Sequence, residues 1–473
     1  MHLTGKVVPI GDPLGTSINT AYVWTISGVG ALGGLLFGYD WVVIGGAKPF
    51  YEKFFHLSSA SQQGWAMSCA LIGCLIGALS SGILSNRLGR KLPLLLSALV
   101  FSVSSVGVAF TGHLAAFVAW RMMGGFAIGL ASSLSPMYIA ELAPAHLRGK
   151  LVSLNQLTLV IGILLAQLAN WLIARPIPYN ATANDILYSW NGQVGWRWMF
   201  GVTVIPSLFF LVAMFFVPES PRWLAGKGRM TKAGMILARI GGTAYSHSLL
   251  LEIKESLQRD YAKTSLRPLL ERKMLRVLGL GVFLAVLQQW CGINVIFNYA
   301  EEVFSAAGYQ VSDILFNIVV TGAVNVIFTV IALRTVDRYG RRILMLFGTS
   351  GLAIIYSVLG FLYYRHSHGL HMLLLVVAAI ACYAMSLAPV TWVVISEIFP
   401  RRIRSAAVSI SVTSLWVACF VLTYTFPLLN ESVGAAGTFW IYAGICTLGF
   451  VYLAIRQPET KGKSLESIER MWD

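Results

Sequence analysis

The chain has 473 residues, of which 56% are hydrophobic and only 12% are charged. A soluble protein carries about 25% charged residues, so most of this surface does not face water. The composition therefore excludes an ordinary soluble globular protein. A net charge of +15 would suggest a nucleic-acid partner for a soluble chain. Here the positions of the basic residues account for the charge, and no nucleic-acid partner is expected.

All six cysteines lie within apolar stretches, and none has metal-ligand spacing with histidine. We therefore expect no metal, no cofactor and no disulfide framework. The first 20 residues are polar and lack the pattern of a cleaved signal peptide, so the first apolar segment should remain in the mature protein.

Apolar runs long enough to cross a membrane need roughly 20 residues each. Twelve such runs follow one another along the chain. They lie near residues 21–47, 64–84, 92–111, 114–138, 151–174, 198–217, 276–304, 313–335, 343–364, 371–396, 406–428 and 438–456.

The sequence thus predicts an all-α membrane protein with two six-helix bundles and a helical linker between them. The longest hydrophilic interruption, 218–275, divides the spans six and six, and its residues 231–259 are typical of an amphipathic helix. The expected segments are an N-terminal tail 1–20, a first bundle 21–217, a cytoplasmic linker 218–275, a second bundle 276–456 and a C-terminal tail 457–473.

The basic residues predict the orientation. Of the 35 lysines and arginines, 29 fall in the tails and in the connections on the same side as the tails. Five fall on the opposite side, and Arg121 alone lies within a span. Cytoplasmic segments of membrane proteins are enriched in lysine and arginine, so both termini are expected in the cytoplasm.

Short motifs recur at matched places in the two halves. The run 86–91 between spans 2 and 3 resembles the run 337–342 between spans 8 and 9. Two homologous halves explain this pattern, which is typical of transporters with a central site. Glu141, Pro144 and Arg148 recur 256 residues later as Glu397, Pro400 and Arg404, and Arg87 and Gly89 recur 251 residues later as Arg338 and Gly340.

The repeated charges predict an ion-pair cluster, serving as a gate, at the cytoplasmic end of each half. Single ion pairs at a wet surface contribute only about 0–1 kcal/mol. A cluster that forms only when the cytoplasmic ends close would still bias a two-state equilibrium. Alternatively, these residues only anchor helix ends at the membrane interface. The expected clusters are Arg87, Glu141 and Arg148, and Arg338, Glu397 and Arg404.

Several motifs together resemble the sugar porter family of the major facilitator superfamily. They are NRLGRK at 86–91, DRYGRR at 337–342, PESPRWL at 218–224, QQWCGIN at 288–294 and PETKG at 458–462. The stretch 134–156 is most similar to the bacterial D-xylose–proton symporter branch. This resemblance implies a twelve-helix, two-bundle transporter that works by alternating access.

The seventh span carries three amides, Gln288, Gln289 and Asn294, with Gly292 loosening the helix between them. Amides both donate and accept hydrogen bonds, as sugar hydroxyls require, and they are costly in lipid. Alternatively, they bridge neighbouring helices. The family resemblance assigns these three to sugar binding, together with Gln156, Asn325, Trp392, Trp416 and Phe37. For the tryptophans alone, core packing is a strong alternative.

Three positions near this pocket depart from the family pattern, so the identity of the sugar does not follow from the resemblance. Asn298 replaces the first tyrosine of a usual pair, Leu415 replaces an amide, and Ala388 replaces a glycine.

Asp40 lies deep in the first span, where a lone carboxylate costs about 2.5–3.5 kcal/mol on insertion scales. Pairing with Arg121 in span 4 would resolve both charges, although a buried pair is weak evidence for stability. A carboxylate that alternates between an arginine and a proton can couple transport to protons; the alternative is a purely structural ion pair. In the family that this chain resembles, proton-driven members carry aspartate here, whereas passive facilitators commonly carry asparagine.

The sequence therefore predicts a sugar–proton symporter of the bacterial cytoplasmic membrane, acting as a monomer in the lipid bilayer on a monosaccharide and a proton. A passive facilitator is the near alternative, and Asp40 argues against it. A sugar sensor would need a signalling extension, and only about 17 residues follow the last span. An enzyme would need a nucleophile–base pair or a metal site within the spans, and none is evident.

Overall fold

The computed structural model describes residues 18–178, 181–261, 271–309, 311–400 and 404–461. Most of both predicted tails and part of the predicted linker lie outside the described residues. The described chain is helical throughout. Its elements are α1 (Thr20–Phe54), α2 (Ala60–Leu88), α3 (Lys91–Phe110), α4 (Leu114–Leu142), α5 (Arg148–Ile173), α6 (Ala183–Tyr188), the π-helix η1 (Asn191–Gly195), α7 (Trp196–Gly201), α8 (Val204–Phe216), α9 (Pro221–Gly226), α10 (Met230–Tyr261), α11 (Arg272–Trp290), α12 (Ile293–Asn298), α13 (Ala300–Ala306), α14 (Val311–Tyr339), α15 (Arg341–Tyr364), α16 (Leu370–Met385), α17 (Leu387–Glu397) and α18 (Arg404–Arg456).

Within the described residues, 11 helical segments are long and apolar enough to cross a membrane. The last of them, Ala406–Arg456, has 51 residues, far more than one crossing needs. Gly434 inside α18 has φ 67° and ψ 176°, which breaks the helix into two arms. The spans predicted at 406–428 and 438–456 lie on the two sides of this break.

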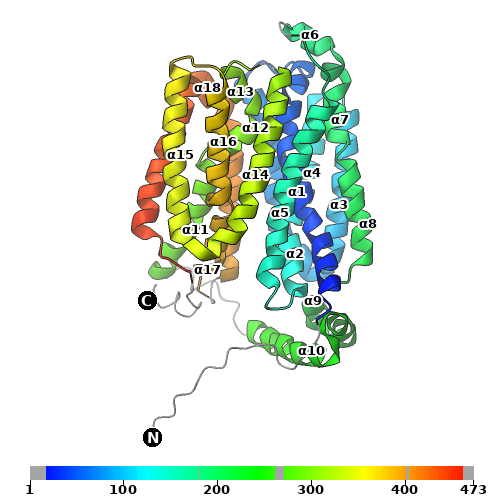
Figure 1. Cartoon of the computed structure of the whole chain (residues 1–473). Coiled ribbons are helices and arrows are strands. Elements are labelled where there is room, and N and C mark those ends of the chain that lie inside the picture. Colours follow the sequence, from blue (N-terminus) through cyan, green and yellow to red (C-terminus); the bar gives the residue numbers. More distant parts are fainter. Residues whose placement is uncertain (1–17, 179–180, 262–270, 310, 401–403, 462–473) are drawn as a thin grey trace.

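The helices form two bundles side by side (Figure 1). In the first bundle α1 packs on α4 and α5, and α3 packs on α4 and α8. In the second, α11 and α15 pack on α18, and α14 packs on α16. The two bundles meet where α2 packs on α18 and where α5 packs on α14. The boundaries of the five segments expected from the sequence stay predictions.

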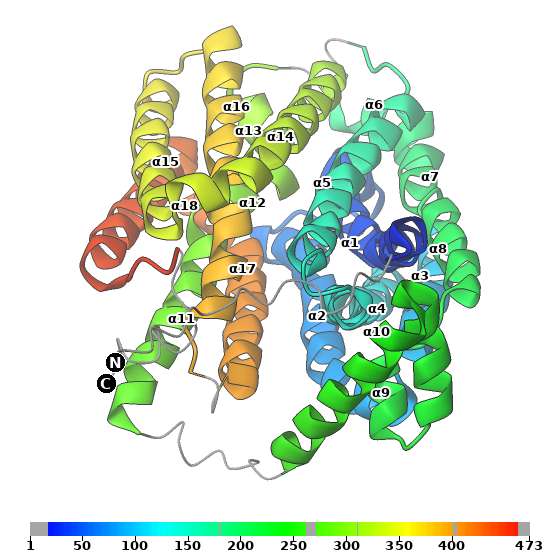
Figure 2. The same ribbon diagram turned by 60° about the horizontal axis from the view of Figure 1, so that its bottom comes forward.

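The short helix α9 and the longer α10 lie beneath the first bundle, as both ribbon views show (Figures 1 and 2). Gly241 and Gly242 interrupt α10 with non-helical backbone angles. We call the end of the molecule near α9 and α10 the linker end. The opposite end, which carries α6 and α13, is the far end (Figure 1).

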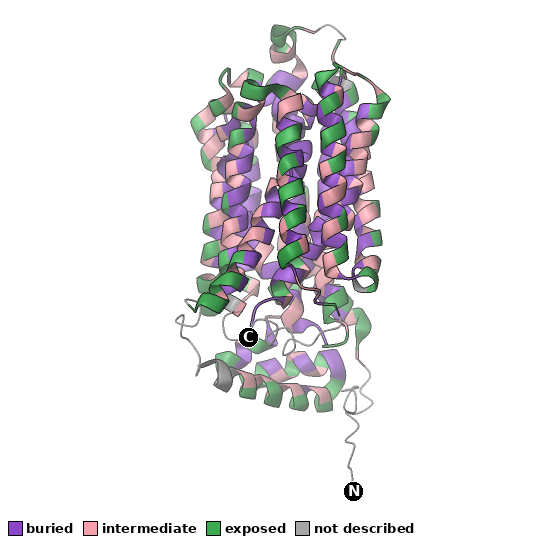
Figure 3. Ribbon diagram, turned by 90° about the vertical axis from the view of Figure 1, so that its left-hand side faces the viewer, coloured by how far each residue is buried: buried purple, intermediate pink, exposed green. Residues whose placement is uncertain are grey.

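Exposed and intermediate residues cover the outer faces of the bundles, and the buried residues face inward (Figure 3). Many of the exposed residues are large and apolar. Phe110, Phe216 and Leu448 are 85%, 83% and 71% exposed. Large apolar side chains with such exposure, distributed around a whole bundle, suit contact with lipid rather than water.

Glycines bring α2 and α4 into direct backbone contact. A Cβ at Gly125 would lie 1.9 Å from the carbonyl oxygen of Ala70, and one at Gly73 would lie 2.0 Å from that of Met122. Small residues at such crossings are typical of membrane bundles, where helix association depends on close packing. This contact holds α4, and with it Arg121, close to the centre of the molecule.

Two breaks interrupt the predicted seventh span and prepare the site. Gly292 has φ 85°, in the left-handed region that favours glycine, and ends α11. Tyr299, with φ −121° and ψ 34°, separates α12 from α13. The sequence predicted one span over 276–304, whereas the structure divides this stretch into three helices.

Replacing Gly125 by alanine should force α2 and α4 apart, because its methyl group would overlap a backbone carbonyl. We expect the Gly125→Ala variant to lose about 1–3 kcal/mol of stability, the usual cost of overpacking. The matched control is Gly82→Ala, since a Cβ at Gly82 of α2 meets nothing within 4 Å. Thermal unfolding in detergent compares the two, and equal midpoints for both variants would contradict the packing argument.

Candidate functional site

A cavity lies at the junction of the two bundles. The first bundle contributes most of its wall, from α1, α2 and α4, and the second bundle contributes one residue each from α12 and α18. Because both bundles form its wall, movement of one against the other changes the shape of the cavity. Its lining residues are Phe37, Asp40, Trp41, Ile44, Met67, Ala70, Leu71, Cys74, Arg121, Ile128, Asn298 and Thr423.

The ion pair expected between Asp40 and Arg121 is present in the wall of this cavity. The Nη1 atom of Arg121 lies 2.5 Å from Oδ1 of Asp40, and the two residues are only 4% and 7% exposed. The guanidinium of Arg121 also lies 5.3 Å from the ring centroid of Phe200. No hydrogen-bond partner for Arg121 Nε occurs among the described residues. The arginine is therefore held by one carboxylate and one aromatic face.

Aromatic rings from both bundles meet beside the ion pair. Phe37 of α1 lies 5.6 Å from Trp416 of α18 and 5.7 Å from Trp41, measured between ring centroids. Trp41 in turn lies 6.5 Å from Trp416. Such rings offer an apolar surface to the C–H face of a sugar. The predicted residues Phe37 and Trp416 are thus brought together across the two bundles.

The three amides of the seventh span form a buried chain of hydrogen bonds. Nδ2 of Asn294 donates to Oε1 of Gln289 at 2.5 Å, and Nε2 of Gln289 donates to Oε1 of Gln288 at 3.1 Å. Nε2 of Gln288 donates to the carbonyl of Ala388 in α17 at 3.4 Å. In this conformation the amides satisfy one another and bridge α11 to α17. Their role in sugar binding stays a prediction.

The remaining predicted sugar-binding residues do not line the cavity. Gln156 of α5 is half-buried, Asn325 of α14 is buried, and Trp392 of α17 is 39% exposed. Asn298, noted in the sequence only as a departure from the family pattern, does line it. Its Oδ1 is buried and has no hydrogen-bond partner among the described residues, so it remains available as an acceptor.

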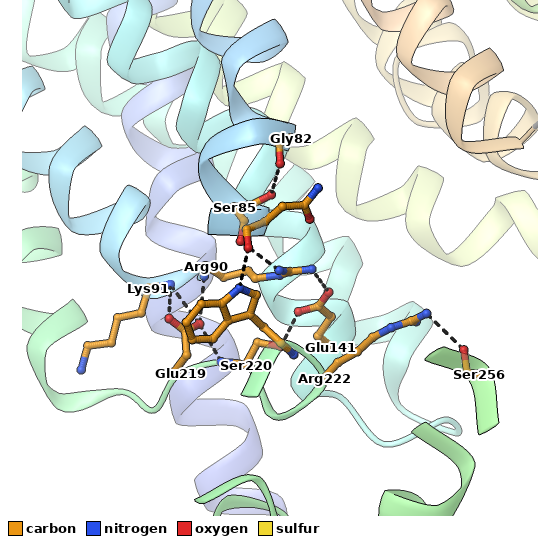
Figure 4. Close-up of polar contacts among 11 residues, drawn as sticks. Gly82, Ser85, Arg90, Lys91, Glu141, Glu219, Ser220, Arg222 and Ser256 are labelled. Carbon is orange, nitrogen blue, oxygen red and sulfur yellow. Dashed lines mark hydrogen bonds and ion pairs between the residues drawn. The ribbon is translucent and has the colours of Figure 1, made fainter. Parts of the chain in front are cut away.

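A polar cluster at the linker end joins α3 and α4 of the first bundle to the connection into α9 (Figure 4). Glu219 accepts hydrogen bonds from the backbone N–H of Arg90 (2.9 Å) and of Lys91 (3.2 Å), at the start of α3. Nη2 of Arg90 lies 2.7 Å from Oε1 of Glu141, at the end of α4. The hydroxyl of Ser220 donates to the other oxygen of Glu141. The connection into α9 is thereby fixed to α3 and α4.

The second bundle repeats this cluster. Glu459 accepts from the backbone N–H of Arg341 and of Arg342, both at 3.0 Å. Nη2 of Arg341 lies 3.2 Å from Glu397, and the hydroxyl of Thr460 donates to Glu397 at 2.6 Å. We call the two sets the Glu141 cluster and the Glu397 cluster. Their matched geometry is the strongest structural sign of a duplicated chain.

The partners of the two glutamates differ from those predicted. Arg90 and Arg341 form the ion pairs expected of Arg87 and Arg338, because they are the last residues before α3 and the first of α15 and point toward the glutamates. Arg87, Arg148 and Arg338 are exposed, and none forms an ion pair within the part of the chain that the structure describes. The guanidinium of Arg404 donates to the carbonyl of Phe399 at 3.0 and 3.1 Å. In both halves the prediction was three positions off, within a motif that holds several basic residues.

Comparison with known proteins settles the family. The family described as "Sugar (and other) transporter" matches residues 26–472. The chain is 39% identical to the D-xylose-proton symporter of Escherichia coli (strain K12), over 97% of this chain and 98% of that one. It is 37% identical to the arabinose-proton symporter of Bacillus subtilis (strain 168), over 97% of each chain. The chain belongs to the Sugar (and other) transporter family.

The fold of this sugar transporter matches a solved structure as well. The major facilitator superfamily proton:xylose symporter XylE, bound to 6-bromo-6-deoxy-D-glucose, superposes with a TM-score of 0.80 at 39% identity. The match covers 96% of the transporter and the whole of that chain. The major facilitator fold predicted from the sequence is therefore confirmed.

Sequence reasoning missed Trp41 and the cavity role of Asn298 in the transporter. Trp41 follows Phe37 by four residues in one helix, so the two rings share a helix face. That spacing, next to Asp40, was a usable signal. Asn298 was harder to find. It lies beside the cavity because α12 ends there, at the break at Tyr299, and this break was not predicted.

Burial raises the pKa of Glu459, but backbone N–H donors from Lys461, Arg341, Arg342 and Thr460 outweigh it and hold that pKa below its usual range. Its contacts therefore stabilise the protein above the usual glutamate pKa, and this contribution is lost as pH falls below it. We expect Glu459→Gln to lower the unfolding midpoint at neutral pH and to match the wild type near about pH 3. Glu431→Gln, at an exposed glutamate of α18, is the control. A deficit of Glu459→Gln that persists unchanged at acid pH would contradict this reasoning.

Proposed function

We propose that the transporter imports a monosaccharide together with a proton by alternating access. One observation carries the proposal: the Asp40–Arg121 pair lies in the wall of a cavity that both bundles form, beside aromatic rings suited to a sugar. The relatives that are named proton symporters for xylose and for arabinose support the same coupling.

The chemistry of coupling follows from the position of Asp40. An ionised Asp40 satisfies Arg121, while a protonated Asp40 releases it and becomes a hydrogen-bond donor itself. The pair lines a cavity whose wall comes from both bundles. Protonation of Asp40 therefore changes the contacts that the cavity offers to a bound sugar. A proton that enters from outside with the sugar would therefore favour the loaded, closed cavity. Release of both on the inside resets the pair.

The energy of this coupling is adequate for uphill transport. One proton crossing 100 mV supplies about 2.3 kcal/mol. At about 1.4 kcal/mol per factor of ten, this corresponds to roughly fiftyfold accumulation of a neutral sugar.

We assign the linker end to the cytoplasm, with both termini there, since the basic residues concentrate on that side of the chain. The Glu141 and Glu397 clusters would then act as the cytoplasmic gate. Each of them ties helix ends within one bundle, so the clusters would support the gate by holding those helix ends together while the bundles move. The six residues predicted for the gate retain this role as a proposal, with Arg90 and Arg341 added to them.

The nature of the sugar follows least directly from the site. Asn298, with its open acceptor, and Trp41 both line the cavity, and Asn298 departs from the pattern of the family. Uptake of labelled D-xylose and D-glucose into proteoliposomes, with and without an imposed proton gradient, tests the proposal. Accumulation that needs the gradient supports symport, whereas equilibration alone would show a passive facilitator.

Asp40→Asn should abolish uphill accumulation and leave sugar exchange intact, because asparagine keeps the shape of aspartate but cannot carry the proton. Accumulation should fall at least about tenfold, from the roughly fiftyfold expected of the wild type. Asp313→Asn, at an exposed aspartate in the first turn of α14, is the matched control. Undiminished accumulation by Asp40→Asn would exclude Asp40 as the coupling group.

Gln288→Ala tests the amide site. Loss of a buried hydrogen-bonding group costs about 1–3 kcal/mol, so we expect the apparent affinity for sugar to weaken by at least about fivefold. Gln62→Ala, at an exposed glutamine of α2, should leave affinity unchanged. Binding is measured by competition against labelled sugar, and unchanged affinity of Gln288→Ala for every transported sugar would remove this residue from the site.

A further inference from the structure

A buried lysine near the far end is surrounded by three carboxylates. The side chain of Lys48 in α1 is 3% exposed, and its Nζ lies 3.1 Å from Glu52 of the same helix. The same Nζ lies 3.5 Å from Glu301 and forms a further ion pair with Glu302, both in α13. The side chains of the three glutamates are only 9%, 25% and 23% exposed. These four residues are here called the Lys48 latch.

The latch joins the two bundles, because α1 belongs to the first bundle and α13 to the second. The backbones are also unusually close at this point. A Cβ at Gly45 would lie 2.9 Å from the carbonyl oxygen of Phe297 and 3.0 Å from that of Asn298, so only glycine allows this approach. Near the start of α2, the hydroxyls of Ser61 and Tyr424 form a second hydrogen bond between the bundles, at 2.9 Å. Opening the far end must separate Lys48 from Glu301 and Glu302.

The charges of the latch do not balance. Three ionised carboxylates against one lysine would leave two uncompensated negative charges in a largely buried place, which is strongly unfavourable. Like charges that share a site do not all ionise, and one of them retains a proton. In agreement, Oε2 of Glu302 is buried without a hydrogen-bond partner among the described residues. When the bundles part, Lys48 and Glu52 leave with α1, and the crowding ends.

We propose that the Lys48 latch closes the far end of the transporter and takes up a proton of its own as it closes, separately from the Asp40–Arg121 pair. This inference rests on the proposed alternating-access function. The latch gives the far-end gate a dependence on external pH that the coupling pair does not supply.

The other ionisable groups around the latch do not supply the missing positive charge. The ring of Tyr299 lies 5.7 Å from Nζ of Lys48, and its hydroxyl donates to the carbonyl of Thr423. The hydroxyl of Tyr51 is engaged with the sulfur of Met67. Lys53 adds some positive charge beside Glu52. Because it is exposed, water and salt screen this charge, and it does not balance the latch. The groups facing the latch from α1, α2, α13 and α18 are Tyr51, Glu52, Lys53, Cys69, Tyr299, Glu301, Glu302 and Tyr442.

The direction of the pH effect follows from the proton count. The closed latch holds more protons than the open one, so low pH stabilises the closed far end, and this stabilisation is lost as pH rises. A more alkaline exterior thus favours outward opening.

The test measures the distance between two spin labels across the far end, at Ser58→Cys and Leu370→Cys, in detergent without sugar. All six native cysteines are buried, which favours labelling at the introduced positions. The measurements use an Asp40→Asn background, so that the coupling pair cannot contribute a proton. We expect the long-distance population to grow as pH is raised from about 5 to about 8, the range above ordinary carboxyl values.

Two variants separate the parts of the proposal. Lys48→Met leaves three carboxylates without their cation and should raise the open-to-closed ratio about tenfold or more, since breaking a buried pair is strongly destabilising. Arg365→Met, at the exposed arginine that follows α15, should match its parent. The double variant Glu301→Gln and Glu302→Gln leaves one lysine and one glutamate, and its distances should no longer depend on pH.

An unchanged distance distribution in Lys48→Met would overturn the latch. An undiminished pH dependence in the double glutamine variant would overturn its proton. Neither result depends on sugar flux, so a failure of the latch is distinguished from a failure of the proposed transport, which the proteoliposome assay measures.

Discussion

A charge buried in a membrane-spanning bundle has to find its counter-charge inside the protein, because neither lipid nor bulk water can stabilise it. In this transporter the constraint is met by Asp40 and Arg121, which lie on different helices and are 81 positions apart in the chain. The glycine contacts between α2 and α4 bring the arginine inward, and α1 carries the aspartate to the same depth. Both residues line the cavity between the bundles, so the charges that require compensation also border the site proposed to hold the sugar.

The same constraint acts differently at the two ends of the molecule. At the linker end, each glutamate is shared between an arginine side chain and a hydroxyl, and the partners belong to one bundle. At the far end, the carboxylates outnumber the cation, and the partners belong to different bundles. Contacts within a bundle keep it rigid, whereas contacts between bundles must break in every cycle. The structure thus combines two internally tied bundles with an interface at which three carboxylates face one lysine.

Much of this architecture could be predicted from the sequence. Apolar length predicted the spans, and repeated motifs predicted two halves. The orientation inferred from charge asymmetry stays a prediction. The Asp40–Arg121 pair could be anticipated because Arg121 was the one strong cation within a predicted span. The choice of Arg90 over Arg87 could not, because it depends on where α2 ends and α3 begins within one short motif. The amide chain of Gln288, Gln289 and Asn294 also required the structure, since hydrogen bonds between neighbours on a broken helix leave no periodic pattern. Lys48 was counted only among the five basic residues opposite the tails. Its partners in the second bundle could not be foreseen, because Glu301 lies 253 positions away.

Glu219 and Glu459 each accept hydrogen bonds from backbone N–H groups, not from side chains, at the starts of α3 and α15. For this contact the side chain of the second donor residue matters little, since lysine stands at 91 and arginine at 342. A side-chain exchange at these places tells little about the contact, whereas a proline would remove the donor altogether. Tolerance to substitution in this motif is thus a poor guide to its importance. Of this contact, only the glutamate is visible in the sequence. Its partners are backbone N–H groups, which every residue except proline has.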